Sequence, residues 1–285
     1  MTAGASGGGR RRLVLALTGA GAARIALAGA RAFTERPAGA PWRRTNYAGR
    51  PVTLLGGPAL ALSATATAVL GAPAGTRAAA AVVGTVSGLV GGYDDLAGAR
   101  PEQARDKGLA GHLRALREGR VSAGAVKVAG IGAAAAVAAL LTRDRARGAG
   151  ALVDGVLTTG LVAGTANLLN LLDLRPGRAA KVGVIAAGAA LGGPAGGLVS
   201  GPLGATLAVL PSDLGEQVML GDCGANALGS LLGLRLAAMP GRGARTAALA
   251  VITGLTLASE KVSFTRVIEA MPGLRELDRL GRLPS

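Results

Sequence analysis

Apolar runs long enough to cross a membrane follow one another through almost the whole chain. Half of the 285 residues are hydrophobic, and the mean hydropathy is +0.44. Ala, Gly, Leu and Val fill windows of about 17 to 22 residues, and about 20 residues of helix span a hydrocarbon core. This pattern favours an all-α, polytopic transmembrane helical bundle over a soluble domain. We predict about nine spans, at roughly 13–31, 54–72, 78–93, 124–142, 151–172, 179–193, 196–212, 224–240 and 244–260.

Small residues are unusually frequent in these runs, with 48 glycines and many alanines in the chain. In membranes, small residues at spacings of four let helix backbones approach closely. We therefore expect tight helix contacts within a single integral membrane domain that comprises residues 1–285. The first run has a second interpretation, because Arg10-Arg11-Arg12, the apolar stretch and Ala28-Gly29-Ala30 also resemble a secretory signal with a cleavage site.

The basic residues predict which way the bundle faces. A net charge of +15 suggests nucleic acid in a soluble protein, but in a membrane protein Lys and Arg collect in cytoplasmic loops. One set of predicted loops, with its borders, carries 19 Lys and Arg, and the other set carries 9. The richer set comprises 32–53, 94–123, 173–178, 213–223 and 261–285. We expect this side to be cytoplasmic, the protein to be a multi-pass protein of the plasma membrane, and nucleic acid not to be a partner.

Acidic residues stand at the ends of apolar runs on the predicted cytoplasmic side. Asp94 and Asp95 follow the run that ends at Tyr93, and Asp222 lies in a Gly-Asp-Cys-Gly turn before another run. A charge near hydrocarbon costs several kcal/mol unless it meets water, a partner or an ion. Carboxylates suit Mg²⁺, which commonly bridges to substrate phosphates. The alternatives are a solvated helix end for the aspartate pair and a helix cap for Asp222.

A second polar motif lies between these two. Asn167, Asn170 and Asp173 are spaced three and three, which puts them on one face of a helix. Such a face could bind a ligand, or it could hold helices together by hydrogen bonds. Asp173 could also form an ion pair with Arg175 or Arg178.

Taken together, these motifs resemble the polyprenyl-phosphate N-acetylhexosamine-1-phosphate transferases, the family that contains phospho-N-acetylmuramoyl-pentapeptide transferase and the undecaprenyl-phosphate N-acetylglucosamine-1-phosphate transferases. That family carries an Asp-Asp pair, an Asn-x-x-Asn-x-x-Asp motif and a Gly-Asp-x-Gly turn, in the order found here. The resemblance extends over roughly residues 44–240. It includes Arg44-Thr45-Asn46 to Gly56-Gly57 and Lys107-Gly108-Leu109.

The resemblance implies a Mg²⁺-dependent transfer of a sugar 1-phosphate from a UDP-sugar to polyprenyl phosphate, with release of UMP, in cell-envelope glycan synthesis. The active site would face the cytoplasm. The catalytic and metal-binding residues would be Asp94, Asp95 and Asp222, although Asp94 or Asp95 could instead orient or deprotonate the lipid phosphate. The substrate-binding residues would be Asn46, Lys107, Asn167, Asn170 and Asp173. Lys127 could pair with a phosphate or extend to the interface as an ordinary lysine. The sugar and the prenyl length stay open, as does the oligomeric state, with a homodimer as one option.

Departures from the family pattern leave open a second hypothesis, a degenerate relative that binds lipid or nucleotide without turnover or acts as a scaffold. Leu174-Arg175-Pro176-Gly177 replaces the usual Gly-x-Asp-Gly, Met219 stands where relatives often have an aromatic, and His112 is the only histidine. Relatives often carry a histidine cluster in the last cytoplasmic loop.

Two further hypotheses come from other classes. A transporter would place charged sites near the middle of the membrane and show repeated halves. A CDP-alcohol phosphotransferase resembles the segment from Asp95 to Arg100, but its later pair of aspartates is absent after Gly108.

The end of the chain differs from the rest, because residues 261–285 alternate apolar and charged side chains. The apolar positions recur at near-helical spacing, and Pro272-Gly273 interrupts them. This predicts a cytoplasmic amphipathic tail with a break, which serves either as a lid over the sugar pocket or as a membrane-surface anchor.

Overall fold

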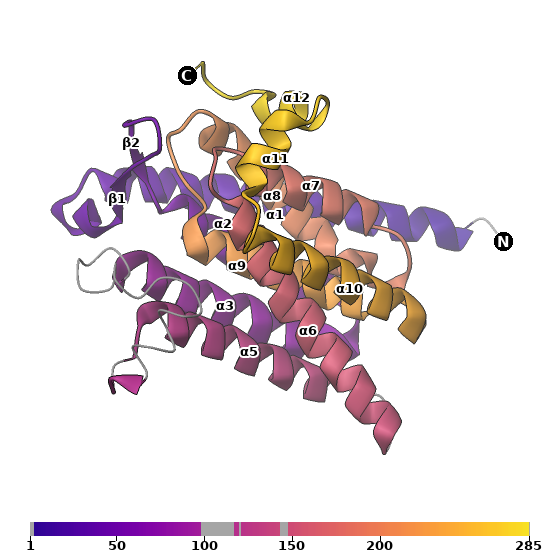
Figure 1. Ribbon diagram of the computed structural model, residues 1–285. Coiled ribbons are helices and arrows are strands. Elements are labelled where there is room, and N and C mark those ends of the chain that lie inside the picture. Colours follow the sequence, from indigo (N-terminus) through magenta and orange to yellow (C-terminus); the bar gives the residue numbers. More distant parts are fainter. Residues whose placement is uncertain (1–2, 98–116, 120, 143–147, 285) are drawn as a thin grey trace.

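The structure is a computed structural model that describes residues 3–97, 117–119, 121–142 and 148–284, and most of these residues are helical. Each of the nine predicted windows overlaps a helix in this part of the chain (Figure 1). The helices are α1 (Ala3–Thr34), α2 (Gly56–Gly71), α3 (Arg77–Ala97), α5 (Ala123–Leu141), α6 (Ala149–Leu172), α7 (Arg178–Ala189), α8 (Gly197–Leu214), α9 (Gly221–Ala237) and α10 (Arg242–Ser259). The expectation of a helical bundle is confirmed.

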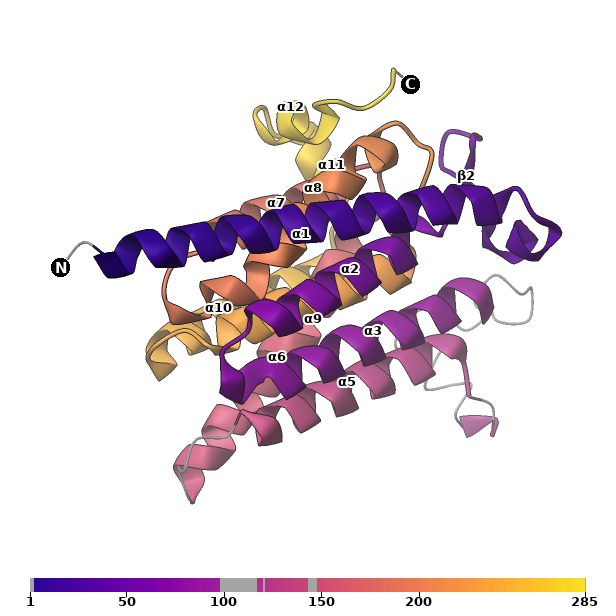
Figure 2. The ribbon, with the colours of Figure 1, turned by 180° about the vertical axis from the view of Figure 1, so that it is seen from behind.

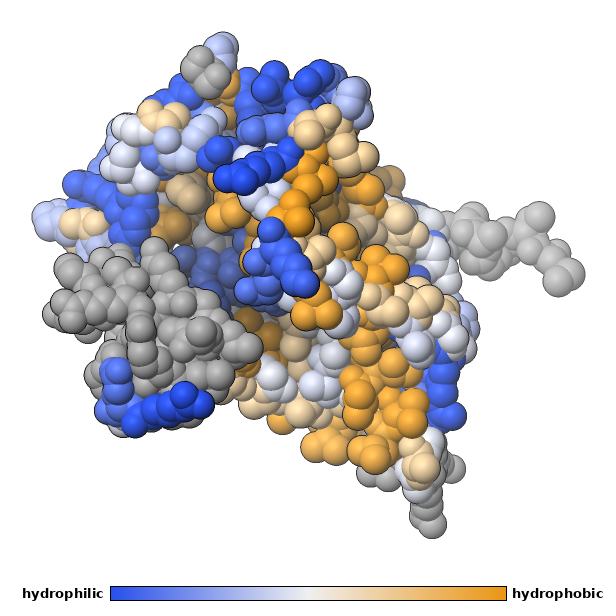
Figure 3. All heavy atoms as spheres, viewed as in Figure 1, coloured by the Kyte–Doolittle hydropathy of each residue, from blue (hydrophilic) through white to orange (hydrophobic). Residues whose placement is uncertain are grey.

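The number of membrane spans is supported only in part. In the described ranges, four helical segments are long and apolar enough to cross a membrane: Gly7–Thr34, Ala123–Leu141, Ala149–Leu172 and Pro194–Leu214. A fifth candidate joins α10 to α11 (Phe264–Ala270) across a bend of 98°. Hydrophobic residues gather over the face formed by α6 and α10, as a membrane protein requires (Figure 3). The figure of nine spans stays a prediction, partly because α2 and α9 have only 16 and 17 residues.

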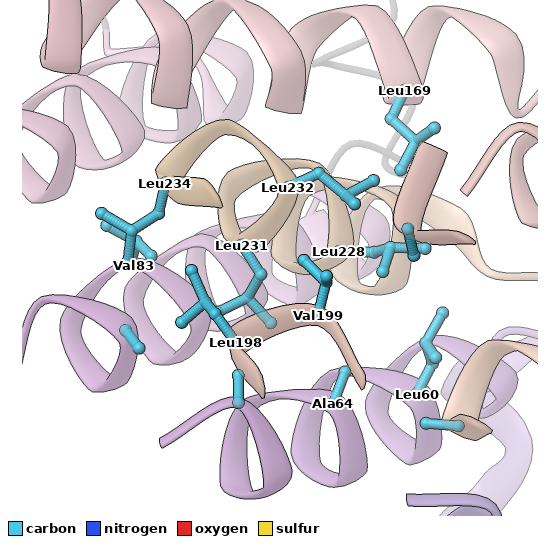
Figure 4. Packing of buried hydrophobic residues seen from close by; sticks show 14 of the residues in the cluster. Leu60, Ala64, Val83, Leu169, Leu198, Val199, Leu228, Leu231, Leu232 and Leu234 are labelled. Carbon is cyan, nitrogen blue, oxygen red and sulfur yellow. The ribbon is translucent and has the colours of Figure 1, made fainter. Parts of the chain in front are cut away.

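Helix α9 forms the centre of the bundle and is buried from Cys223 to Leu234. A helix that is apolar or small on all sides must be enclosed by other helices. Figure 4 shows its leucines among Leu60 of α2, Val83 of α3 and Leu198 of α8. From behind, α1 runs along the outside of α2 and α8 (Figure 2).

Glycines bring α9 into direct backbone contact with α6, as the small-residue pattern predicts. A Cβ added at Gly229 would lie 2.6 Å from Ala166 Cα, and one at Gly233 would lie 2.4 Å from Leu161 O. No real side chain fits at such distances, so close packing here depends on glycine. The spacing of four along α9 repeats the contact on successive turns.

A small hairpin within the predicted loop 32–53 adds strands to the helical fold. β1 (Arg43–Thr45) pairs antiparallel with β2 (Pro51–Thr53). The Met219 amide donates to Thr53 O at 2.8 Å, which ties the hairpin to the segment just before α9. The first long loop therefore packs against the Gly-Asp turn.

The tail folds back onto α7 as α11 and α12 (Leu274–Arg279), with the predicted break between them confirmed (Figure 1). Arg178 Nε donates to Asp278 Oδ1 at 2.8 Å, and Arg178 Nη2 donates to Oδ2 at 3.1 Å. Lys181 Nζ donates to Asp278 O at 2.8 Å. Both side chains of the Arg178–Asp278 pair are buried. This buried ion pair, which we call the clamp, holds the tail against α7.

Acid is expected to release this tail. Burial opposes ionisation of Asp278, but hydrogen bonds and charge from Arg178 outweigh it and lower the pKa of Asp278 below its ordinary value. Because the folded pKa is the lower one, the stabilisation is present above the unfolded pKa of about 3.9 and is lost as the pH falls through the folded value. Hydrogen exchange of residues 264–280, corrected for intrinsic rates, should show protection falling in this acid range.

The variant Asp278→Asn should reproduce the loss at neutral pH, because it leaves Arg178 buried without its carboxylate. Glu269→Gln is the matched control, since Glu269 is exposed on the same tail. Equal protection in Asp278→Asn and the unmodified protein would contradict the clamp.

Candidate active site

Four helix ends that are far apart in the sequence meet at one end of the bundle, which we call the acidic end. They are the ends of α3 and α6 and the starts of α5 and α9. Glycine again permits the approach, because a Cβ at Gly91 of α3 would lie 2.3 Å from Asp222 O. The aspartates predicted from separate motifs are therefore neighbours in space.

Lys127 joins two of these aspartates. Ser122 caps α5 by accepting a hydrogen bond from the Ala125 amide, which sets Lys127 in the first turns of the helix. Lys127 Nζ donates to Asp94 Oδ2 at 2.6 Å and also to Asp222 Oδ2. The three side chains, which we call the Asp94–Lys127–Asp222 cluster, are between 17% and 23% exposed. One ammonium therefore faces two carboxylates in a largely enclosed place, and Lys127 points at these carboxylates rather than at the membrane interface.

Asp95 has a different environment from its neighbour Asp94. Its Oδ1 accepts from the Asp222 amide at 2.9 Å, and its Oδ2 accepts from the Cys223 amide at 3.0 Å. These amides belong to the first turn of α9, where backbone donors lack helical partners and the helix dipole favours an anion. Asp95 thus acts as a cap from another helix and fixes the position of Asp222.

The backbone of Gly221 makes this cap possible. Its φ is +56°, and a Cβ there would lie 2.8 Å from both carboxylate oxygens of Asp95. A side chain at this position would both strain the turn and displace the cap.

Asp173 ends α6 beside the same turn. Its carboxylate lies near the Gly221 amide and near the carboxylates of Asp213 and Asp222. Burial and then the charge of Asp213 raise the pKa of Asp173 well above its ordinary value. Of the other two residues of this motif, Asn167 is exposed and Asn170 is half-buried on α6. The predicted face therefore exists, and its last member reaches the acidic end.

Asn46 belongs to the hairpin turn. Its Oδ1 accepts from the Ala48 and Arg50 amides, both at 2.9 Å, and its Nδ2 donates to Glu216 Oε2. Arg50 Nε also pairs with Glu216 Oε2 at 2.8 Å. These contacts give Asn46 a structural role, because they hold the hairpin turn together and tie it to Glu216. Its contact with substrate stays a prediction.

A small cavity of about 30 Å³ separates the hairpin from the end of α6. Asn46, Asp173 and Met219 line it, together with residues that the sequence analysis did not single out: Tyr47, Asp213 and Glu216. Arg175 lies over the Tyr47 ring, with Cζ 4.2 Å from the ring centroid.

Asp213 and Glu216 are acidic residues buried to 2% and 5% exposure. Asp213 Oδ2 accepts from the Gly177 amide at 3.1 Å and so holds the loop after α6. The signal that found Asp94 could have found Asp213, because Asp213 also comes at the end of an apolar run.

Magnesium fits part of the predicted ligand set. Mg²⁺ takes oxygen ligands and is commonly bound by one or two carboxylates together with substrate phosphates. Asp94 and Asp222 suit this role, because a cation already lies between them. Asp95 suits it less, because both its oxygens accept backbone hydrogen bonds. Among the described residues, no group of three His, Cys, Asp or Glu side chains is arranged to hold a metal ion.

Two residues named in the sequence analysis, Lys107 and His112, lie outside the described residues. Lys107 as a substrate contact therefore stays a prediction.

Comparison with known proteins does not assign the chain to a family. No protein-family model matches the chain, and no curated protein matches it. The resemblance to the transferases thus depends on the motifs themselves. The geometry of the acidic end is a second observation that bears on the function.

Proposed function

We propose that the protein transfers a sugar 1-phosphate, with N-acetylhexosamine 1-phosphate as the expected group, from a UDP-sugar to polyprenyl phosphate at the acidic end of the bundle. The observation that carries this proposal is the meeting of three sequence motifs at one place. Asp94, Asp173 and Asp222 come from helices that are 49 or more residues apart, and their side chains gather around a single turn. The charge asymmetry of the loops supports a cytoplasmic position for this end.

The reaction joins two phosphates, so its main obstacle is charge. An oxygen of polyprenyl phosphate attacks the phosphorus that carries the sugar, a new P–O–P bond forms, and the bond to the UMP oxygen breaks. Positioning and neutralisation of charge supply most of the catalysis in such transfers. Bound Mg²⁺, held by Asp94 and Asp222, would neutralise phosphate charge and orient the two groups.

The residues of this chain have separate roles in the proposal. Lys127 pairs with a phosphate oxygen when substrate binds, since its ammonium already lies beside Asp222 in the first turn of α9. Asp95 is a positioning residue that keeps the first turn of α9 in place. Asp173 lies toward the nucleotide.

The hairpin supplies an aromatic group for the nucleotide side. Met219 occupies the position at which relatives often carry an aromatic, but Tyr47 lines the same cavity from the hairpin. Its ring already stacks with the Arg175 guanidinium, and it is 46% exposed. Stacking of a base on an aromatic ring is worth about 1–3 kcal/mol. In this proposal the exposed face of Tyr47, outside the small cavity, takes the stacking role that Met219 lacks.

The test is release of UMP by the purified full chain with UDP-N-acetylglucosamine, polyprenyl phosphate and Mg²⁺. We expect turnover in the unmodified protein and a loss of at least about 100-fold in Asp222→Asn and Asp94→Asn, because each removes a carboxylate that faces the phosphates. Glu35→Gln is the control, since Glu35 is exposed in the loop before the hairpin. Equal rates in Asp222→Asn and the unmodified protein would reject the assignment of the site.

A second candidate is a relative that binds these ligands without turnover. Lys127 favours it, because an ammonium already pairs with both carboxylates that would hold the metal. Binding of UDP-sugar or polyprenyl phosphate without UMP release from any UDP-sugar would establish this alternative.

A further inference from the structure

A polar cavity of about 330 Å³ lies at the end of the bundle opposite the acidic end. It is enclosed by the end of α5, the start of α6, the turn between α9 and α10, and Thr76 before α3. Asp94, Lys127 and Asp222 lie at the other ends of these helices. The cavity is therefore separate from the proposed active site.

Asp154 and Arg245 line the cavity, and Arg242 lies beside it against Asp154. Asp154 of α6 accepts from Arg242 Nη2 at 2.8 Å and from Arg245 Nη2 at 2.7 Å. Two guanidinium groups thus share one carboxylate, so this group of three side chains, two of which line the cavity, carries one net positive charge. A ligand with one negative charge would complete the set.

Arg245 is the better placed of the two arginines to bind such a ligand. Its side chain lines the cavity and is 16% exposed, whereas that of Arg242 is 51% exposed. A guanidinium has five N–H donors. Arg245 Nε is buried and has no hydrogen-bond partner within the described residues. Leaving a buried donor without an acceptor is unfavourable, so binding of an acceptor at Arg245 would be favourable.

An apolar groove of about 690 Å³ adjoins this cavity between α5 and α6. Cavity and groove share Ala139, Ala151 and Gly155, so they are two parts of one gap. The groove is lined by Ala, Gly, Leu and Val with one Thr. Leu140 and Leu152, which flank it, are 68% and 70% exposed. Both helices are long and apolar enough to cross a membrane, so the groove opens toward hydrocarbon.

We propose that this gap binds a phospholipid with one net negative charge. The phosphate lies against Arg245, with Arg242 beside the cavity adding positive charge, and an acyl chain lies in the groove between α5 and α6. The occupant follows from the adjoining chemistry, since a cavity beside an excess of positive charge continues into an apolar groove between two helices that are apolar enough to cross a membrane. This proposal does not depend on the proposed transferase activity.

Native mass spectrometry of the detergent-purified full chain tests it, with titration of dioleoyl phosphatidylglycerol, dioleoyl phosphatidylcholine and inorganic phosphate. We expect phosphatidylglycerol to bind about tenfold more tightly than phosphatidylcholine. Arg245→Gln should weaken that binding at least about tenfold, because it removes a charge-assisted hydrogen bond to the phosphate. Arg77→Gln is the control, as an exposed arginine at the same end that does not line the cavity.

The chain also offers a matched pair of variants for the groove. A Cβ at Gly155 or at Gly132 meets no atom within 4 Å, so the first side-chain carbon of a leucine clashes at neither position. Gly155→Leu fills the gap and should weaken phosphatidylglycerol binding, whereas Gly132→Leu lies outside the groove and should not. Gly155→Leu also keeps the proposal testable if Arg245→Gln does not fold.

Two outcomes would overturn the proposal. Equal binding of phosphatidylglycerol and phosphatidylcholine, unchanged in Arg245→Gln, would remove the role of charge. Displacement of phosphatidylglycerol by inorganic phosphate, with Gly155→Leu behaving as the unmodified protein, would indicate a free-anion site and not a lipid site.

Discussion

Lys127→Met is expected to lower the free energy of unfolding by about 3–5 kcal/mol, because it removes one partner of a buried set of charges. Asp94 and Asp222 would then face each other with no ammonium between them. Lys127→Arg should restore most of the loss, since it keeps the charge. Thermal unfolding in detergent measures the effect, and Lys261→Met is the control because Lys261 is exposed.

The same variant reports on metal binding without any assay of activity. If Asp94 and Asp222 can hold Mg²⁺, removal of the competing ammonium should strengthen that binding, and a ligand that binds only the folded state raises its stability. We therefore expect Mg²⁺ to raise the Tm of Lys127→Met more than that of the unmodified protein. An equal shift in both proteins, or none, would count against a magnesium site at these carboxylates.

Gly91→Ala is expected to destabilise the protein by about 1–3 kcal/mol and to lower UMP release about 100-fold. The added Cβ would lie 2.3 Å from Asp222 O and 2.8 Å from Cys223 N, so α3 and α9 would have to separate. That movement would displace the Asp95 cap and shift Asp222 relative to Asp94. Thermal unfolding and the UMP assay measure the two effects.

The next residue along α3 provides the control. A Cβ at Gly92 meets Cys223 Sγ at 3.7 Å, which is ordinary van der Waals contact. Gly92→Ala should therefore have near-normal stability and turnover. Similar behaviour of Gly91→Ala and Gly92→Ala would mean that the close approach of α3 and α9 does not hold the site together.

The acidic end illustrates what sequence patterns can predict. Asp94, Asp95 and Asp222 were predicted to share one side because each stands at the end of an apolar run, and the structure brings them together. A run end can be read locally, from the change in composition at that point. Which partner the side chain contacts depends on how the helices pack against one another, and this packing cannot be predicted from a single sequence.

Asp94 and Asp95 show this limit most clearly. They are adjacent in sequence and their pattern predicts the same role, yet Asp94 faces Lys127 and Asp95 caps α9. Successive residues on a helix point about 100° apart, so two neighbours meet different helices. The choice between cap and ion pair depends on where the turn at Gly221 comes to lie.

The sequence by itself determined the helical class, the nine helical windows, the break in the tail and the common end of the acidic motifs. All of these depend on composition and periodicity along a short stretch of chain. Only the tertiary structure decided that Lys127 bridges two aspartates, that the hairpin at 43–53 packs against the turn before α9, and that α5 and α6 leave a gap. The reason is that these features depend on close contacts between distant segments, and in this chain the glycines of α3 and α9 set how closely the helices approach.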